Sequence, residues 1–565
     1  MERVQRSLVH ANRATWLAVR WLFDTQAGPG NRFVARWIFL RTLAAIYASA
    51  FYSLLFQIVG LNGPHGILPA QRFLLDVQSQ AGPLRYWYVP TLFWLSSGSH
   101  AMMAAMWLGL AASVAALFNL WPRLSFFICF ICFLSFVTAA QAFSSYQSDS
   151  MLLEAGFLVL FFAPRGIRPG WGMASPPSRA SLFLLQWEWF RIYFESGVVK
   201  LLSGDTEWRN FTAMDEYYQN GPLPTWIGWY VEHLPHWFHA ATVAATLGME
   251  LVVVWMLFLP RHVRLICFCI VTPWEIGVIL TANYTFLNYL VLTLGFLLLD
   301  DGSVRWLLPR RVRDTLPASP PQEAEARKTE ARKTEALSIL DAPGEDNDTV
   351  AATVRARTSW FNAARVCLSA TMLTWIGYAT TAEMIRMQWP DLPLPSLPVM
   401  VLEPFRIANQ YGLFAVMTRG RYEIEFQGSN DGQSWTPYLF RYKPQALDKA
   451  PGIYAPYQPR FEWNLWFASL GEWRQNDLVP LTEERLLEND PEVLALFRAN
   501  PFGEAPPRYA RAVLWQYWFT SMDEKRRTGN WWKRELLGLY APELTRQADG
   551  KFAAIEMPGE LPPHD

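Results

Sequence analysis

Long apolar stretches dominate the first 390 residues and restrict this chain to a membrane-embedded fold. A helix that crosses a bilayer needs about 20 apolar residues. The candidate spans are residues 37–60, 98–120, 123–146, 150–164, 181–203, 238–260, 263–281, 284–300 and 360–385. Of the 565 residues, 52% are hydrophobic and only 17% are charged, which argues against an ordinary soluble protein. The sequence therefore predicts a polytopic α-helical membrane protein with about nine spans.

Lysine and arginine are unevenly distributed between alternate loops, and this distribution sets the expected orientation. Cytoplasmic loops of membrane proteins collect positive charge. If the amino terminus is cytoplasmic, the loops on its side contain 22 lysines and arginines, and the opposite loops contain 3. An odd number of spans then places everything after residue 386 outside the cytoplasm, in a lumen or periplasm. The net charge is zero, so there is no reason to expect a nucleic-acid partner.

Changes in composition divide the chain into six expected parts. In order, these are a cytoplasmic N-terminal segment, a multi-span membrane domain, a flexible cytoplasmic linker, a last transmembrane helix, an outer soluble domain and a tail. They cover residues 1–36, 37–301, 302–358, 359–386, 387–550 and 551–565. The linker repeats Glu-Ala-Arg-Lys-Thr and has no apolar face, as is typical of a solvated spacer. The membrane is that of the endoplasmic reticulum if the chain is eukaryotic, or the inner membrane if it is bacterial.

After about residue 400 the pattern changes to that of a soluble, β-rich α+β domain. Residues 422–427 alternate in polarity with a period of two, 429–432 is typical of a turn, and 435–442 predicts an aromatic strand. Together they predict a β-hairpin. The segments 482–499 and 507–519 have helical spacing of their apolar residues. The domain contains no cysteine, so no disulfide is expected in it.

Charged residues inside the apolar segments are candidate functional residues, because a charge at bilayer depth costs at least ~2.5 kcal/mol. Glu188, Arg191 and Glu195 fall on one face of the helix predicted at 181–203. We interpret them as an ion-paired polar stripe that faces the interior of the bundle. Other acids in the apolar segments outnumber the bases there, which also favours internal pairing.

Lys200 is the only lysine in the first 327 residues and lies near the end of the same helix, away from the polar stripe. Two interpretations stay open. A lysine near a helix end commonly extends its amine to the membrane interface, whereas a buried lysine with a lowered pKa can act as a base. Pairing with Asp205 or with Asp149 is a further option. Lys200, Asp205 and Asp149 are therefore candidate catalytic residues, although none is assigned that role.

The sequence contains no motif that predicts a metal or a cofactor. It lacks a phosphate-binding glycine loop, a HExxH motif and a Gly-x-Ser-x-Gly motif. Cys129 and Cys132 have CxxC spacing, but they lie in an apolar helix and are expected to pack as small hydrophobic residues. His233, His236 and His239 lie at a membrane boundary around a proline, which favours interfacial histidines over a metal site. We expect no metal and no cofactor.

Many short motifs resemble those of the lipase maturation factor family. In the membrane part they include Asp149-Ser-Met-Leu-Leu-Glu-Ala-Gly-Phe157, Ser196-Gly-Val-Val-Lys-Leu-Leu-Ser-Gly-Asp205 and Asn283-Tyr-Thr-Phe-Leu-Asn288. In the outer part they include Asn409-x-Tyr-Gly-Leu-Phe-Ala-Val-Met417, Gly428-Ser-Asn-Asp-Gly432 and Arg441-Tyr-Lys-Pro444. The resemblance covers about residues 37–542, with the linker as a gap. It implies a membrane-embedded factor whose outer domain engages exported client proteins, such as lipases, and helps them reach their active form.

Tryptophans of the outer domain are candidate anchors for such a client, because tryptophan is enriched where protein interfaces concentrate their binding energy. They are Trp435, Trp463, Trp466, Trp531 and Trp532. The alternative, which we prefer, is that these rings form the core of the domain.

A fainter resemblance offers an enzymatic alternative. Gly197-Val-Val-Lys-Leu201, with Asp205 and Trp208, is similar to the lysine-bearing helix of the vitamin K-dependent gamma-carboxylase membrane domain. This resemblance implies that Lys200 is a catalytic base. That family has a histidine in an Asn-His-Ser-Tyr-like stretch, where this chain has Ser148-Asp149-Ser150. The alternative function is a gamma-carboxylase-like membrane enzyme that modifies a lumenal or lipid substrate, and the maturation factor is the preferred prediction.

Overall fold

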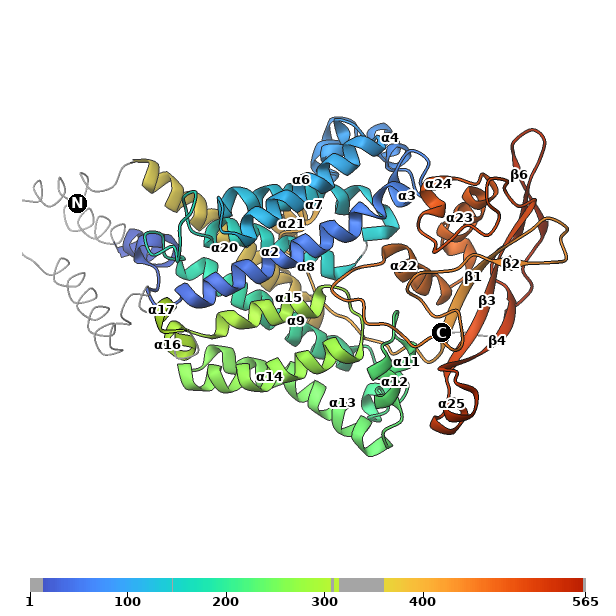
Figure 1. Cartoon of the computed structure of the whole chain (residues 1–565). Coiled ribbons are helices and arrows are strands. Elements are labelled where there is room, and N and C mark those ends of the chain that lie inside the picture. The colour runs from blue at the N-terminus through green and yellow to red at the C-terminus, as the bar shows by residue number, and fades with distance from the viewer. Residues whose placement is uncertain (1–13, 145, 306–308, 314–359, 562–565) are drawn as a thin grey trace, which may run out of the picture.

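A computed structural model describes the chain apart from residues 1–13, 145, 306–308, 314–359 and 562–565. Most of the predicted linker at 302–358 and the first third of the predicted N-terminal segment at 1–36 therefore lie outside the described residues. The described part consists of a helical membrane domain and a C-terminal sheet domain, which are joined end to end (Figure 1). The sheet domain keeps the name outer domain from its expected location.

Helices occupy all of the segments that the sequence predicts as spans. They are α2 (Phe33–Leu55), α6 (Ser99–Leu117), α7 (Pro122–Ala139), α8 (Gln147–Phe162), α9 (Arg179–Leu202), α13 (His236–Leu251), α14 (Arg261–Thr281), α15 (Leu287–Gly295) and α20 (Trp360–Gln388). Shorter helices of this domain are α3 (Ile58–Asn62), α4 (Ala70–Ala81), α5 (Arg85–Tyr88), α10 (Thr206–Arg209), α11 (Tyr217–Asn220), α12 (Trp226–Glu232), α16 (Asp301–Val304), α17 (Arg310–Arg313) and α21 (Leu397–Leu402).

Among the described residues, five stretches are long and apolar enough to cross a membrane: α2, α6, α7, α14, and α13 together with the 3-10 helix η5 (Val253–Phe258). Helix α8 is too short at 16 residues, and α9 carries several charges along its 24. The apolar windows of α2 and α7 are 61% and 67% buried, so these helices form the centre of the bundle. The corresponding values for α13–η5 and α14 are 28% and 17%, which places these helices at the periphery.

The outer domain is built on a six-stranded antiparallel sheet with the order β2-β1-β3-β5-β6, and β4 also pairs with β3. The strands are β1 (Arg421–Ser429), β2 (Thr436–Pro437), β3 (Tyr509–Phe519), β4 (Trp532–Leu539), β5 (Glu543–Arg546) and β6 (Phe552–Glu556). The helices are α22 (Arg460–Ser469), α23 (Leu478–Leu487), α24 (Pro491–Leu494) and α25 (Met522–Thr528). Helices α22 to α24 lie between the sheet and the membrane domain (Figure 1).

The local predictions for this domain are partly confirmed. Strands β1 and β2 form the expected hairpin, although β2 covers only two residues of the predicted strand at 435–442. Helices α23 and α24 overlap the helical prediction at 482–499. The helical prediction for 507–519 is wrong, because this segment contains β3, which is largely buried on both faces and so lacks a clear alternation. The predicted tail at 551–565 is not separate from the domain, since β6 pairs with β5.

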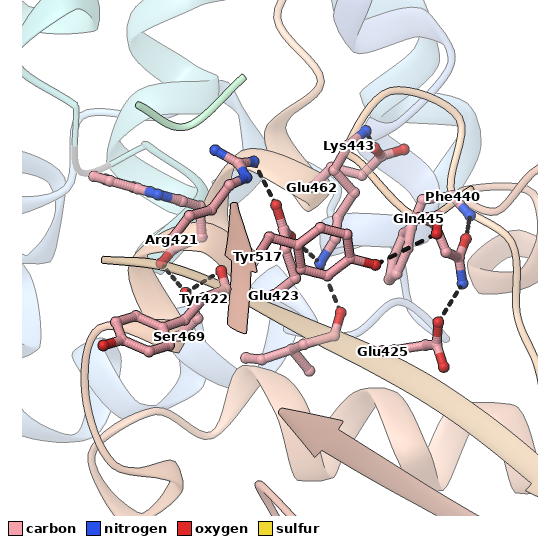
Figure 2. Close-up of polar contacts among 12 residues, drawn as sticks. Arg421, Tyr422, Glu423, Glu425, Phe440, Lys443, Gln445, Glu462, Ser469 and Tyr517 are labelled. Carbon is pink, nitrogen blue, oxygen red and sulfur yellow. Dashed lines mark hydrogen bonds and ion pairs between the residues drawn. The ribbon is translucent and has the colours of Figure 1, made fainter. Parts of the chain in front are cut away.

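Strand β1 carries charged side chains on a face that is nevertheless buried. Arg421, Glu423 and Glu425 alternate along it (Figure 2), and all three are buried. Both Arg421 and Lys443 pair with Glu423, and the Lys443 Nζ lies 2.8 Å from that carboxylate. Arg534 of β4 pairs with Glu425 at 3.1 Å. Each buried charge therefore has an opposite charge beside it, as burial requires.

Glu462 of α22 is a buried acid that accepts three backbone hydrogen bonds. The donors are the N–H groups of Arg441, Tyr442 and Lys443, at 2.9, 2.8 and 2.5 Å. Burial nevertheless raises the pKa of Glu462 from 4.5 to about 7. The folded domain therefore holds a proton that the unfolded chain releases in this pH range. The stability that this group contributes is complete below about pH 4.5 and is lost as the pH rises to about 7.

We expect Glu462→Gln to flatten the pH dependence of thermal stability between pH 4.5 and pH 7, the window of the raised pKa. The shift corresponds to roughly 3 kcal/mol of unfolding free energy across this window. The measurement is the unfolding midpoint of the purified full chain in detergent at a series of pH values. Glu504→Gln, at an exposed glutamate, is the control. A Glu462→Gln variant that keeps the wild-type pH slope would contradict this assignment.

Candidate functional site

An extended segment, residues 407–418, passes through the polar interior of the membrane domain. It follows α21 and the turn η8 (Glu403–Phe405) and leads toward β1. It forms neither helix nor strand, so its backbone N–H and C=O groups need other partners. Irregular backbone inside a membrane protein is tolerated only where other groups of the protein or a water-filled cavity satisfy it. This segment is termed the strap below.

Side chains of α8 and α9 supply partners for the first half of the strap. Glu154 accepts hydrogen bonds from the backbone N–H and the side-chain amide of Asn409, both at 3.1 Å. Arg191 donates to the carbonyl of Asn409 at 2.5 Å and also binds Glu154. Glu195 accepts from the N–H of Tyr411 at 2.6 Å. Three charged side chains of the bundle are therefore used to hold backbone groups of the strap.

Residues beyond the end of α9, together with one residue of α8 and one of α9, hold the second half of the strap. Asp205 accepts from the N–H of Met417 at 2.8 Å. The indole of Trp208 donates to the carbonyl of Phe414 at 2.9 Å. Further hydrogen bonds to the strap backbone come from Gln147 to Gly412, Ser196 to Leu413 and Asn220 to Thr418. The strap is thus bound along its whole length.

The strap gives the predicted polar stripe a structural role. Glu188, Arg191 and Glu195 are fully buried, and Arg191 lies 4.0 Å from Glu195. The stripe faces the interior, where Arg191 and Glu195 bind the backbone of the strap. Among the described residues, no hydrogen bond or ion pair joins Glu188 to the strap. Sequence reasoning missed the strap because residues 407–418 have no periodic pattern; its only signal was the family resemblance of Asn409 to Met417.

A buried ion pair outside the strap joins the two domains. Arg460, at the start of α22, makes two hydrogen bonds to Asp149, at the start of α8, with distances of 2.7 and 2.8 Å. Both side chains have no exposed surface. Arg460 also donates to the carbonyl of Phe143 at 2.8 Å. Because a guanidinium bound through two parallel hydrogen bonds fixes orientation as well as distance, this pair sets the position of the outer domain.

Two amide side chains of the membrane domain add further links across the junction. The Asn283 Nδ2 donates to the carbonyl of Gly452 at 2.9 Å, and its Oδ1 accepts from the N–H of Tyr454 at 2.7 Å. The Gln57 Oε1 accepts from the N–H of Arg460 at 2.7 Å. Asn283 belongs to one of the motifs that carry the family resemblance, as Asp149 does. The junction is therefore made of specific polar contacts rather than of loose packing.

Lys200 is buried, with 3% of its surface exposed, so its amine does not reach an interface. Its Nζ lies 2.7 and 2.9 Å from the two carboxylate oxygens of Glu250, at the end of α13. Neither of the two partners considered from the sequence pairs with it, because Asp149 binds Arg460 and Asp205 holds the strap. The option that Lys200 pairs with Asp205 or Asp149 is therefore wrong, since packing brings α13 against α9.

Lys200 and Glu250 line a cavity of about 340 Å³ between α9, α13, α14 and the strap. Its lining is mostly apolar, with a polar end that also includes Glu275, which accepts from the hydroxyl of Tyr193 at 2.6 Å. A second cavity of about 400 Å³ lies beside it. Residues shared by both linings are Tyr217, Tyr284, Leu287, Leu413 and Phe414. The strap therefore forms part of the wall of both cavities.

The five tryptophans predicted as client anchors lie mostly inside the protein. Trp463, Trp466 and Trp532 are buried, and the first two line the second cavity. Trp435 and Trp531 are half-buried, and each has a basic side chain against its ring, at 3.9 and 3.8 Å from the centroid. Three of the five rings therefore serve packing, which is the alternative interpretation, and two keep exposed edges.

The described part of the chain contains no group of three or more His, Cys, Asp or Glu side chains that could hold a metal ion. Cys129 and Cys132 are free and buried in α7. His233 binds backbone carbonyls of Trp229 and Thr520, at 2.7 and 3.0 Å. These side chains are used in packing and in local hydrogen bonds.

These features define a class of membrane protein, in which a helical bundle binds an extended segment of its own chain and so fixes an outer sheet domain. Comparison with known proteins gives the family. The lipase maturation factor transmembrane domain matches residues 34–306, and the lipase maturation factor C-terminal domain matches residues 407–542. The chain belongs to the lipase maturation factor family.

Individual relatives support this assignment over most of the chain. Lipase maturation factor 2 of Gallus gallus is 33% identical, over 93% of this chain and 84% of the relative. Lipase maturation factor 2 of Homo sapiens is 31% identical, over 91% of this chain and 83% of the relative. Lipase maturation factor 1 of Bos taurus is 28% identical, over 94% of this chain and 92% of the relative. No solved structure matches the chain. These relatives give no support to the gamma-carboxylase alternative.

Proposed function

We propose that this chain is a membrane-embedded maturation factor that helps exported proteins, such as lipases, reach their active form. The observation that carries the proposal is its similarity to lipase maturation factors 1 and 2 across both domains and the strap. The buried bonds between the bundle and the outer domain support it, because they present the outer domain at a fixed position. The client is engaged by that domain, outside the cytoplasm.

The proposal includes nine spans, a cytoplasmic amino terminus and an outer domain in a lumen or periplasm. Helices at the nine apolar segments support the span number. The loops on the side of the amino terminus contain 22 lysines and arginines and the opposite loops contain 3, which supports the orientation. The membrane is that of the endoplasmic reticulum in a eukaryote and the inner membrane in a bacterium.

The client-binding surface is proposed to lie on the outer domain, at the edge of β4. Strand β4 pairs with β3 on one side and has no other partner strand among the described residues. The N–H groups of Trp531 and Trp532 donate to the carbonyl of Leu447, so the edge proposed for the client begins after Trp532. The strand exposes Leu536, and Trp531 with its half-buried ring directly precedes it. Unpaired strand edges bind extended segments of other proteins through backbone hydrogen bonds. A client that is not fully folded offers such segments.

Rescue of lipase secretion tests the proposed function. The full chain is expressed in cells that lack their own lipase maturation factors, and the activity of a secreted lipase is measured per amount of lipase protein. We expect a clear rise over cells that carry the empty vector. The amount and monodispersity of the membrane-inserted chain are measured in parallel. Folded chain at a normal level with no rise in lipase activity would contradict the proposal.

A variant pair separates a structural from a catalytic role of Lys200. Lys200→Met leaves the carboxylate of Glu250 buried without its partner, and removing one partner of a buried ion pair costs about 3–5 kcal/mol. We expect a sharp fall in the amount of folded protein. In Lys200→Met/Glu250→Leu both charges are absent, so the amount of folded protein should recover. Size-exclusion chromatography of detergent extracts measures this amount. A recovered double variant that matures no lipase would instead assign chemistry to Lys200.

A further inference from the structure

The cavity beside Lys200 opens between α13 and α14, the two peripheral helices of the bundle. Phe238 and Thr242 of α13 are partly exposed where they line it, and Pro273 and Gly277 of α14 are exposed. The two helices diverge toward the outer domain (Figure 1). Because only 28% and 17% of the apolar windows of α13–η5 and α14 are buried, the remaining apolar side chains of these helices face lipid in a membrane. The mouth of the cavity therefore meets hydrocarbon rather than water.

The size and the lining of this cavity suit an apolar chain. Its volume of about 340 Å³ lies within the range of roughly 300–1,000 Å³ that is typical of small-molecule sites. Ile192, Met214, Val278 and Val291 are among its apolar lining residues. A Cβ atom built on Gly277 meets no atom within 4 Å, so the space beside this residue is open. Open apolar cavities of this kind accept apolar ligands.

The charges at the polar end select the head group of such a ligand. Lys200 and Glu250 neutralise one another, and Glu275 adds a second carboxyl group. The lining therefore offers no unpaired positive charge, and an anionic head group is disfavoured. A carboxylate has about four lone-pair sites, so both acids can still accept hydrogen bonds from a hydroxyl group.

We propose that this cavity binds a neutral, hydroxyl-bearing membrane lipid with one acyl chain. The chain lies along the apolar lining, and the hydroxyl groups donate to Glu250 and Glu275. The lipid enters sideways, between α13 and α14. This site is separate from the client-binding surface at β4, and the proposal does not depend on the maturation function.

Photolabelling of the purified full chain in detergent tests the proposal. The probe is a monoacylglycerol with a photoreactive diazirine in its acyl chain, and labelled peptides are identified by mass spectrometry. We expect adducts on the cavity-lining peptides of α13 and α14. Gly277→Leu adds a bulky side chain at a lining residue whose Cβ meets no atom within 4 Å, and it should lower this labelling about tenfold, which corresponds to ~1.4 kcal/mol of binding free energy.

Gly248→Leu on α13 is the matched control. A Cβ atom there also meets nothing within 4 Å, but Gly248 does not line the cavity, so labelling should stay at the wild-type level. Equal labelling of Gly277→Leu and wild type, or adducts only outside the cavity lining, would overturn the proposal. A photoreactive fatty acid of equal chain length that labels more strongly would overturn the neutral head group. If Gly277→Leu fails to fold, Thr242→Leu on the opposite wall gives the same comparison.

Discussion

Arg191→Met should remove most of the folded protein from the membrane. Arg191 is the charge that balances Glu154 and Glu195, and it also donates to the carbonyl of Asn409. Methionine leaves two buried carboxylates without a positive partner. Breaking a buried pair costs about 3–5 kcal/mol, and whole domains are stable by only about 5–15 kcal/mol. The measurement is the amount, monodispersity and thermal midpoint of a fluorescently tagged chain in detergent extracts.

Two further variants test whether the effect of Arg191→Met comes from the loss of its buried charge. Arg526→Met removes an arginine whose ion pair with Asp523 is mostly exposed, so it should change stability by no more than about 1 kcal/mol. In Arg191→Met/Glu154→Gln one of the two stranded charges is gone, and the amide oxygen can still accept from Asn409. This double variant should be more stable than Arg191→Met alone. An Arg191→Met chain with a wild-type midpoint would show that the strap does not need the buried charge.

Arg460→Met should release the outer domain from its fixed position on the bundle. The variant strands Asp149, which is completely buried, and it removes the hydrogen bond to the carbonyl of Phe143. We expect a loss of about 3–5 kcal/mol in stability, faster protease cleavage between α20 and β1, and little rescue of lipase secretion. Limited proteolysis of membranes that contain the full chain measures the rate of cleavage between α20 and β1. The lipase assay measures the loss of rescue.

The double variant Arg460→Met/Asp149→Leu separates stability from orientation at the junction. Replacement of both members of a buried ion pair by apolar residues is often close to neutral for stability, so this chain should regain its wild-type amount. It lacks the two parallel hydrogen bonds that orient the outer domain. Lipase rescue should therefore stay below wild type. Full rescue by this double variant would show that the orientation of the outer domain is unimportant for maturation.

Local patterns in the sequence were sufficient to place the helical segments and the first hairpin. A helix or a tight hairpin depends mainly on residues that are close in sequence, so apolar length and a turn motif predict it. The common face of Glu188, Arg191 and Glu195 follows from helical spacing in the same way. What these side chains bind could not be predicted, because Asn409 lies 218 residues from Arg191 and has no periodic pattern around it.

Other parts of the site depended on long-range packing. Asp149 and Arg460 are separated by 311 residues, and no local rule connects an acid at a helix start with an arginine in another domain. Glu250 lies in the apolar segment 238–260, but its pairing with Lys200 depends on the packing of α13 on α9, which no local pattern predicts. The segment of β3 is predicted as a helix because burial on both faces removes the alternation that marks a strand. Trp463 and Trp466 are buried, which agrees with the core interpretation of these rings rather than with the anchor interpretation.

Amide hydrogen exchange over the strap tests the central claim most directly. The N–H groups of Asn409, Tyr411 and Met417 donate to buried carboxylates, although residues 407–418 contain no helix or strand. In the full chain in detergent, we expect the strap to exchange as slowly as α9 and much more slowly than the exposed loop 503–506. Exchange of residues 407–418 at the rate of that loop would contradict the account, because the strap N–H groups would then not be hydrogen-bonded to the buried carboxylates.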